Sequence, residues 1–473
     1  MSYVMVQMFM SDDDIMVAGE FQAVVLAAGH GSRMTEVTAG RPKCLLPIAN
    51  MPMIWYPLRM LEREGFQDAI VIVADNTKSE IQAALEKCNL SIRLDYAALP
   101  PGKEDWGTAD SLQFINEKIK SDVVVVSSDF ITDASLYPAL ELFRKNEAAV
   151  TMFFLKPAEV SAGDSLPTPG PKTKHKPERD LVGINADTSR LVLLASVSDF
   201  DETLPLSRGL LRKHPHLQLY SRLLDSHVYI LRKWVCEFLV QERSLGTLKG
   251  ELLPYIVRKQ SSKPTQKVED ASTIRGNTKN DIFQFAKEST LVSKVLPISL
   301  SNDHWGDMKG TFQDDKIRCY AHIVEGTSFG MRVNTLQAYA SINREILQIW
   351  EKVTGGNVLV RLHPGAEVKS TQVDDSTLVG EGTLLNEKTS FKSSTIGASC
   401  TVMSRTRISN CVIMNNVKVN EGCVLTNCIL CDGVEVGANT ELKDCLVGAK
   451  HTVGAGDKHN QEFLADEDVL MEI

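Results

Sequence analysis

Two positive side chains and a glycine-rich turn follow a short apolar run near the start of the chain. Residues 23–28 are small or branched and apolar, which is typical of a buried strand in a parallel sheet. Glycines after this run let backbone amides face an anion, and Arg33 and Lys43 supply fixed positive charges. The pattern predicts a site at the carboxyl end of the strand that holds a triphosphate and a leaving pyrophosphate. Its residues are Gly29, Gly31, Ser32, Arg33 and Lys43.

The elements around this site alternate between strand and helix patterns. Strands are expected at 69–74, 92–97, 122–127, 148–155, 181–184, 190–196 and 227–231, and helices at 51–64, 79–87, 108–118, 133–145, 233–241 and 248–259. This alternation predicts an α/β doubly wound domain over residues 21–260, in which parallel strands bring their carboxyl ends to one edge.

The segments outside these patterns divide the rest of the chain. Residues 1–20 are methionine-rich without a basic residue, so we expect a flexible N-terminal extension rather than a targeting signal. Residues 157–180 are rich in proline and lysine, which predicts a mobile insertion in the domain. Residues 261–355 are expected to form a linker and connecting segment, with a strand at 317–324 and a helix at 335–350.

The last part of the chain has an internal repeat. Aliphatic residues recur in steps of five or six residues from Ile396 to Val453, so that three successive steps span 17 residues. Coils of this length cannot bury their apolar edge alone and must stack. The six-residue unit resembles that of hexapeptide proteins, which implies a left-handed parallel β-helix over 356–457 and a C-terminal tail at 458–473.

The ten cysteines are expected to be reduced. Five of them fall on the small interior position of the predicted coils: Cys400, Cys411, Cys423, Cys428 and Cys445. Cys428 and Cys431 have the spacing of a zinc half-site, but no second pair completes it, so we favour core packing over metal. Between residues 379 and 453 the only histidine is His451, which argues against the acyl transfer found on some hexapeptide helices.

Composition argues against several classes of function. A net charge of -9 and a pI of 5.7 speak against a broad surface for nucleic acid or anionic membrane. No apolar run approaches the ~20 residues that span a bilayer. We therefore expect a cytoplasmic (cytosolic) protein with no membrane contact, no direct nucleic-acid contact and no cofactor.

The glycine turn and the lysine segment that follows it occur together in a known fold. Two strings resemble the nucleotidyltransferase fold of sugar-1-phosphate pyrophosphorylases: LAAGHGSR at 26–33 and PKCLLP at 42–47. The resemblance implies that Gly107 and Thr108 stand in a second nucleotide loop. It also implies that Asp129 and Asp225 stand where that family holds its divalent metal. Either carboxylate could instead simply end a strand in a turn.

Several positions depart from that family's pattern. Its proline and two of its glycines are replaced by Glu36, Asp110 and His227, respectively. No glutamine occurs in 95–107 and no glutamate-lysine-proline string in 191–201, although the family uses them for the base and the sugar phosphate. Losing a charged contact with a phosphoryl-type transition state lowers the rate by orders of magnitude. We therefore predict a vestigial pocket without a catalytic residue, in which Asp129 and Asp225 are relics of metal positions.

Longer strings narrow the resemblance to one family. They include WGTADSLQFI at 106–115, SSDFITD at 127–133, ELLPYIVRKQ at 251–260 and VLMEI at 469–473. From about residue 21 to residue 473 the chain is similar to the gamma-subunit family of eukaryotic translation initiation factor 2B. This resemblance implies a non-catalytic subunit of the complex that exchanges GDP for GTP on eukaryotic initiation factor 2.

The resemblance also implies partners. They are the epsilon subunit as a direct partner, the alpha, beta and delta subunits in a decamer, and initiation factor 2 through its own gamma subunit. In that family the exchange catalysis lies in a helical domain of epsilon. The present sequence ends soon after its last predicted coil, so we do not expect that domain here.

Three other interpretations stay open. The chain could be an active sugar-1-phosphate guanylyltransferase similar to GDP-mannose pyrophosphorylase. It could also keep a pocket that binds a nucleotide or sugar phosphate without turnover, through Arg33 and Lys43. In the plainest interpretation, residues 29–43 form a turn with two solvated basic side chains.

Overall fold

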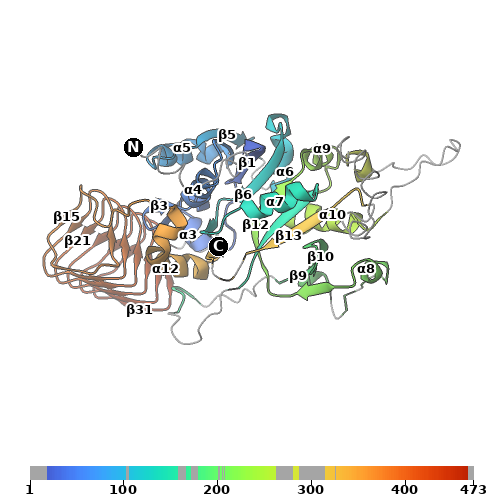
Figure 1. Cartoon of the computed structure of the whole chain (residues 1–473). Coiled ribbons are helices and arrows are strands. Elements are labelled where there is room, and N and C mark those ends of the chain that lie inside the picture. Colours follow the sequence, from blue (N-terminus) through green and yellow to red (C-terminus); the bar gives the residue numbers. More distant parts are fainter. Residues whose placement is uncertain are drawn as a thin grey trace, which may run out of the picture.

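The computed structural model shows an α/β domain packed against a three-sided β-helix (Figure 1). It describes residues 19–102, 106–157, 167–171, 179–200, 203–204, 206, 208–262, 281–286, 315–324, 326 and 328–466. Most of the predicted N-terminal extension, 1–20, lies outside the described residues, as do parts of 157–180 and 261–355 and residues 467–473. The predicted fold class, a doubly wound domain followed by a left-handed β-helix, is confirmed.

The α/β domain is built on a seven-stranded sheet in the order β13-β8-β12-β6-β1-β4-β5. Its strands are β1 (Phe21–Leu26), β4 (Asp68–Ala74), β5 (Arg93–Leu99), β6 (Asp122–Ser127), β8 (Val150–Leu155), β12 (Leu224–Leu231) and β13 (Cys319–Ile323). All are parallel except β12, which runs antiparallel to both neighbours. The carboxyl ends of β1 and β6 therefore meet at one edge, where the predicted phosphate site lies.

Helices cover both faces of this sheet and bury its alternate side chains. They are α4 (Trp55–Arg63), α5 (Lys78–Glu86), α6 (Thr108–Phe114), α7 (Tyr137–Lys145), α9 (Lys233–Gln241) and α10 (Leu253–Lys259), the last preceded by the π-helical turn η5 (Leu248–Leu252). The short helix α3 (Thr35–Thr38) instead places Val37 in the apolar cluster at the junction with the β-helix. Val24 faces the core under α6, α9 and α10, whereas Val25 faces the core under α4, α5 and α7. Apolar side chains on both faces explain why these strands are continuous apolar runs.

Two helices begin later than the sequence pattern predicts, because short strands precede them. The helix predicted at 51–64 begins at Trp55, after a hairpin of β2 (Pro47–Ile48) and β3 (Met51–Pro52). The helix predicted at 133–145 begins at Tyr137, because β7 (Phe130–Thr132) pairs with β14 (Gly330–Arg332). The second pairing brings a distant segment to the end of β6.

A smaller antiparallel sheet lies beside α10, in the order β10-β9-β11. Its strands are β9 (Asp180–Asn185), β10 (Leu191–Ser196) and β11 (Leu217–Tyr220), and helix α8 (Arg208–Lys213) precedes β11. The sequence pattern predicted β9 and β10 but missed β11 and α8. In Figure 1 this small sheet lies at the opposite end of the molecule from the β-helix.

The β-helix consists of three parallel sheets of six strands each. The first holds β15 (Glu367–Val368), β18 (Leu384–Leu385), β21 (Thr401–Val402), β24 (Lys418–Val419), β27 (Glu435–Val436) and β30 (Thr452–Val453). The second holds β16 (Gln372–Val373), β19 (Ser390–Lys392), β22 (Arg407–Ser409), β25 (Val424–Thr426), β28 (Glu441–Lys443) and β31 (Lys458–Asn460). The third holds β17 (Leu378–Val379), β20 (Thr395–Ile396), β23 (Val412–Ile413), β26 (Ile429–Leu430), β29 (Leu446–Val447) and β32 (Phe463–Leu464).

The coils follow the predicted 17-residue register. Ile396 pairs with Ile413, which pairs with Leu430, and Leu430 pairs with Val447. The five cysteines predicted at interior positions are buried there among these aliphatic side chains. Strands β31 and β32 extend the solenoid into residues 458–464, which the sequence pattern assigned to a tail.

Helix α12 (Leu336–Thr354) joins the two parts by packing between them. Trp350 of α12 stacks on Trp55 of α4 at 5.8 Å between ring centroids. Tyr339 donates a hydrogen bond to the Pro47 carbonyl at 2.7 Å. The third sheet of the β-helix contributes Ile429 and other apolar side chains to the same cluster. The connecting segment 261–355 thus supplies β13 to the main sheet and α12 to the junction.

Residues 167–171 of the insertion predicted to be mobile lie against the β-helix. The Gly170 amide donates to the Asp444 carbonyl at 2.8 Å, and Asn427 Nδ2 donates to the Pro167 carbonyl at 2.8 Å. Among the described helices, none has the length and apolar character that crossing a bilayer requires.

Candidate nucleotide site

The glycine turn after β1 packs on the side chain of Lys43. Gly31 has a φ of 77°, and a Cβ there would lie 3.2 Å from both Lys43 Cδ and Thr38 Cγ2. Glycine is therefore required at residue 31, because any other side chain would be strained and crowded. Ser32 and Arg33 are exposed, and the next residue, Met34, is buried and fixes the turn to the core.

Asp129 lies at the end of β6, and two positive side chains hold it. Its carboxylate forms an ion pair with Lys43 and accepts hydrogen bonds from Arg332 Nε at 3.1 Å and Ser127 Oγ at 2.6 Å. Asp129 is 1% exposed. Burial alone would raise the pKa of the Asp129 carboxyl, but Arg332 and Lys43 hold that pKa well below its ordinary value. The carboxylate is thus ionised and neutralised from within the chain.

Asp225 lies on β12 and is held by neutral donors. Its Oδ1 accepts from the His227 amide at 2.9 Å, and its Oδ2 accepts from the Tyr229 hydroxyl at 2.7 Å. Burial raises the pKa of the Asp225 carboxyl, and Lys249 opposes that rise. The charge of Arg332 acts to lower the pKa of both Asp129 and Asp225.

His227 stands where the related enzymes are expected to have a glycine. Its φ of 54° is in the left-handed region, which costs a residue with a side chain of the order of 1 kcal/mol or more. The register of β12 against β8 shifts at this point. The imidazole Nε2 is buried without a hydrogen-bond partner, and burial holds the pKa of His227 well below its ordinary value. A bulky neutral ring therefore takes the place of an open backbone.

Asp129 and Asp225, which the sequence analysis interprets as relics of metal positions, do not fit a divalent cation as they are held here. The oxygens of Asp129 receive hydrogen bonds or ion pairs from Lys43, Arg332 and Ser127, and those of Asp225 receive hydrogen bonds. A divalent metal needs ionised carboxylate oxygens that point at a common open position. Within the described part of the chain, no three His, Cys, Asp or Glu side chains form a group that could hold a metal ion.

Gly107 and Thr108, predicted as a second nucleotide loop, pack against another turn of the protein. A Cβ on Gly107 would lie 2.1 Å from the Gly246 carbonyl oxygen. That oxygen accepts from the amides of Ala109 and Asp110 at 2.9 and 3.3 Å. Thr108 Oγ1 accepts from the Leu248 amide at 2.9 Å. The amides at the start of α6 thus bind a carbonyl of this chain.

The hollow at the ends of β1, β4 and β5 is small. It has a volume of about 70 Å³, lined by Ala28, Ala74, Asp75, Asn76, Leu99, Pro100 and Pro101. Pockets for drug-sized ligands usually measure roughly 300–1,000 Å³. Gly31, Lys43 and Asp129 are not among the residues that line this hollow.

The structure therefore brings some of the predicted site residues together, whereas Gly107 and Thr108 pack against the turn at Gly246. Gly31, Lys43 and Asp129 meet at the carboxyl edge of the sheet. Arg332 was missed by sequence reasoning, because 203 residues separate it from Asp129 and only the pairing of β14 with β7 brings them together. No local motif signals this arginine.

Comparison with known proteins gives two matching families. Residues 22–162 match the family described as nucleotidyl transferase. Residues 365–458 match the left-handed β-helix domain of eIF2B subunit epsilon. These matches fall on the α/β domain and on the solenoid, respectively.

Curated relatives match different shares of the chain. An eIF2B subunit gamma of Dictyostelium discoideum is 27% identical over 407 residues, which cover 82% of this chain and 89% of the relative. An eIF2B subunit gamma of Caenorhabditis elegans is 32% identical over 245 residues, which cover 51% of this chain and 59% of the relative. A glucose-1-phosphate thymidylyltransferase of Neisseria gonorrhoeae is 39% identical over 80 residues, only 17% of this chain and 28% of the enzyme. The predicted resemblance to the gamma subunits is confirmed, and the match to sugar nucleotidyltransferases is short.

Proposed function

We propose that this chain is a gamma-type subunit of translation initiation factor eIF2B, and that its nucleotidyl transferase domain serves assembly rather than catalysis. Similarity to relatives that bear this name, over most of the chain, supports the first part. The β-helix match to the epsilon subunit supports the same class of factor.

The observation that carries the second part is the pairing of Asp129 with Lys43 and Arg332. In nucleotidyl transfer, an acidic side chain holds the metal while positive side chains hold the phosphates. Here both kinds of group neutralise each other in a buried cluster. Removing either kind from its partner leaves an uncompensated buried charge, which is strongly unfavourable. The paired charges therefore stabilise the folded domain, and we infer that they do so in place of binding a metal and a phosphate.

We further propose the assembly that this function requires. The epsilon subunit is the direct partner, and alpha, beta and delta subunits complete a decamer. The complex acts in the cytosol and binds eukaryotic initiation factor 2 through that factor's gamma subunit. The three sheets of the solenoid support this role, because stacked coils offer extended surfaces for a partner.

A second candidate function is favoured by one observation. Lys43 and Arg332 both face the carboxylate of Asp129, and Arg33 follows the Gly31 turn, which packs on Lys43. Basic groups gathered at the carboxyl edge of the sheet suit a small phosphate ligand held without turnover. Calorimetry with GTP, GDP and mannose-1-phosphate tests it, and absence of heat at millimolar ligand would remove it.

Affinity capture of the full chain from cytosol tests the proposed function most broadly. We expect the other four kinds of eIF2B subunit and initiation factor 2 to copurify, and we expect the chain alone not to accelerate GDP release from initiation factor 2. Capture without any of these proteins would contradict the proposal. Acceleration by the isolated chain would contradict the assignment of catalysis to another subunit.

A further inference from the structure

Strand β11 of the small sheet has an open edge. Within the described part of the chain, β11 pairs only with β9, whereas the opposite strand β10 is covered by the main sheet through the bridge of Arg190 to Tyr320 and by packing against α10. The register shift between Leu191 and Leu193 further protects β10. Natural proteins usually protect an open edge with charged residues, proline or a bulge. Strand β11 reads Leu-Gln-Leu-Tyr and has none of these devices.

The outer face of this sheet is apolar beside the open edge. Gly183 lies on the central strand, and a Cβ there would meet Leu193 Cβ at 2.8 Å, Leu217 Cδ1 at 3.2 Å and Leu219 Cδ2 at 3.3 Å. The three leucines therefore converge over a glycine. Leu219 is 51% exposed, although leucine is usually buried. Leu193, Leu217 and Leu219 thus form an apolar surface that no other element covers among the described residues.

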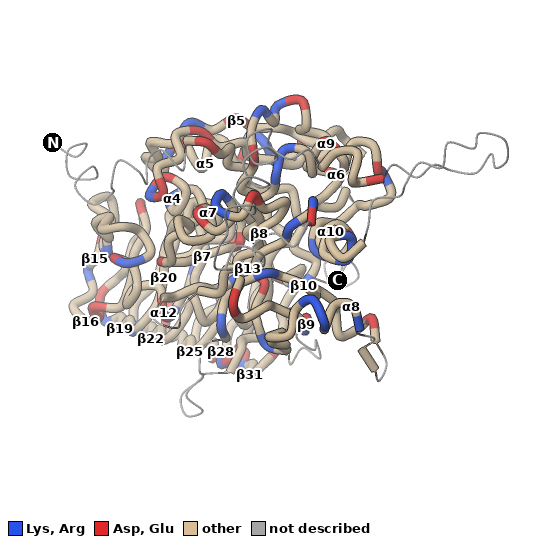
Figure 2. The backbone as a smooth tube through the Cα atoms, turned by 45° about the vertical axis from the view of Figure 1, so that its right-hand side comes forward, with Lys and Arg blue, Asp and Glu red and all other residues tan. Residues whose placement is uncertain are grey.

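Arginines lie at both ends of β11. Arg208 and Arg212 are on α8, just before the strand, and Arg222 follows it. Because Tyr220 pairs with Val182, the antiparallel register places the Arg222 end of β11 beside the Arg179 end of β9. All four arginines are exposed, and Figure 2 shows positive segments along α8 and beside β9. This is a basic corner in a chain whose net charge is -9.

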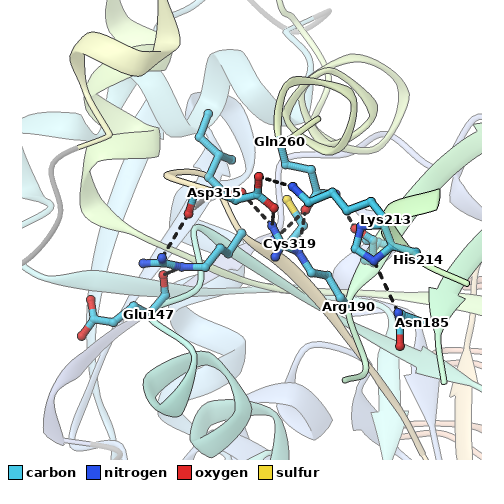
Figure 3. Close-up of polar contacts among 11 residues, drawn as sticks. Glu147, Asn185, Arg190, Lys213, His214, Gln260, Asp315 and Cys319 are labelled. Carbon is cyan, nitrogen blue, oxygen red and sulfur yellow. Dashed lines mark hydrogen bonds and ion pairs between the residues drawn. The ribbon is translucent and has the colours of Figure 1, made fainter. Parts of the chain in front are cut away.

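A buried polar network fixes this corner to the main sheet (Figure 3). Asp315 accepts from Arg190 Nη2 at 2.6 Å and forms a second ion pair with Lys213 at the end of α8. Gln260 Oε1 accepts from Arg190 Nε at 3.2 Å and from the Cys319 amide at 3.3 Å. Arg190 is 2% exposed, so the network is internal. The edge is therefore held in place before any partner arrives, which lowers the entropic cost of binding.

We propose that β11 is a docking edge for an extended acidic segment of a partner protein, in which Asp or Glu alternates with apolar residues. The segment pairs as an added strand with the free edge of β11, as in other cases of strand addition. Its apolar residues lie over Leu217 and Leu219, because alternate residues of a strand share one face. Its acidic residues reach the arginines at the two ends of the strand.

Binding of labelled peptides to the full chain tests this proposal. The probe is a peptide of about nine residues in which Glu alternates with Val, long enough to pass both ends of β11. Fluorescence anisotropy should show binding that weakens as salt rises from about 50 to about 300 mM, since exposed charges are screened. A peptide in which Lys replaces Glu should not bind, and one in which Ser replaces Val should bind at least about tenfold more weakly.

Surface variants locate the site. Leu219→Lys and the double variant Arg208→Glu/Arg212→Glu should each weaken binding of the Glu–Val peptide at least about tenfold. Val424→Lys, on the exposed face of the β-helix, and Arg243→Glu, after α9, are matched controls and should leave binding unchanged. All these positions are exposed, so the melting temperatures should stay close to that of the unchanged chain.

Several results would overturn the proposal. One is equal binding of the Glu–Val and Lys–Val peptides, and another is binding that the β11 and α8 variants do not alter. Self-association of the full chain in sedimentation, abolished by Leu219→Lys, would assign the edge to a second copy. Tighter binding of a single-stranded RNA that is lost in the arginine variant would assign the corner to nucleic acid.

Discussion

The β-helix and the candidate nucleotide site are built from contacts of opposite kinds. In the β-helix, paired residues lie 17 positions apart in the sequence except between β16 and β19, where Gln372 pairs with Ser390, and the interior holds aliphatic side chains and thiols. In the nucleotide site, Asp129 forms ion pairs with Lys43, 86 residues away, and with Arg332, 203 residues away. The first kind of contact repeats along the sequence, and the second occurs once.

This difference shows that the shape of the domain and the state of the charges at its strand ends depend on separate contacts. The apolar strands of the main sheet pack in the same way whether or not the strand ends bind a substrate. The charged side chains at those ends need partners of opposite charge, and here Asp129 pairs with Lys43 and Arg332. Separate residues thus determine the shape of the domain and the state of its strand-end charges, and four substitutions test this difference.

The largest effect is expected from a charge inside the β-helix. Leu430→Asp places a carboxylate in a fully buried position of the repeat and should destabilise the chain by at least about 4–5 kcal/mol. Thr452→Asp, at an exposed position of a neighbouring sheet, is the control and should change stability by less than about 0.5 kcal/mol. Chemical denaturation followed by circular dichroism measures both. Equal losses in the two variants would mean that the interior does not govern stability.

A smaller but still large effect is expected where charges pair. Asp129→Asn leaves the partly buried Lys43 and Arg332 without their carboxylate and should cost about 3–5 kcal/mol. Asp225→Asn is the matched variant: its oxygen still accepts from the His227 amide and its nitrogen can donate to the Tyr229 hydroxyl, so the loss should stay below about 1 kcal/mol. Urea denaturation compares them. Equal stability of the two variants would show that Asp129 is not the centre of a neutralised cluster.

His214 lies close to the charges of Arg190, Lys213 and Asp315, and it should make the free energy of unfolding fall at mildly acidic pH. Burial, and then Arg190 and Lys213, lower the pKa of His214 to about 4, whereas an unfolded histidine titrates near about 6.5. As the pH falls from about 6.5 to about 4, the unfolded chain gains a proton that the folded chain does not, so stability falls. His214→Gln should lose less in melting temperature across this range than the unchanged chain.

His216→Gln is the control for that experiment, because His216 is exposed and pairs with Asp187 at the surface. Its melting profile should follow that of the unchanged chain. If His214→Gln follows the same profile, the buried histidine does not contribute to the acid sensitivity.

The smallest effect is expected at the contact of the insertion with the β-helix. Gly170 and Gly102 both have positive φ, but a Cβ on Gly170 would lie 3.3 Å from Leu446 Cβ, whereas Gly102 has open space around it. Gly170→Ala should therefore destabilise the chain by about 1 kcal/mol more than Gly102→Ala. Thermal denaturation of the pair measures the difference. Equal losses would show that the insertion does not pack on the solenoid.

Much of the fold could be predicted from the sequence where local patterns decide it. The strand at 122–127 and the helix at 233–241 have the predicted bounds. The continuous apolar run of the first is typical of a buried strand, and the apolar spacing of the second is typical of a helix. The 17-residue register was predicted because it repeats. Strand β11 was missed, since an alternation of four residues is too short to stand out, and α7 starts late because β7 pairs with a segment far away in the sequence.

The candidate site was predicted only in part for the same physical reason. Gly31 and Lys43 belong to local strings, so their positions could be read directly. The state of Asp129 depends on Arg332, and the covering of Gly107 depends on Gly246. Arg332 comes from the distant strand β14 and Gly246 from a distant turn, and neither belongs to a motif, so only the tertiary structure shows that the predicted groups are already engaged.

Pyrophosphate release by the purified full chain with GTP, mannose-1-phosphate and magnesium tests the central claim most directly. Because Asp129 is neutralised by Lys43 and Arg332, we expect no release above the background of the Asp129→Ala variant. Turnover by the unchanged chain that Asp129→Ala abolishes would contradict the account and identify an active nucleotidyltransferase.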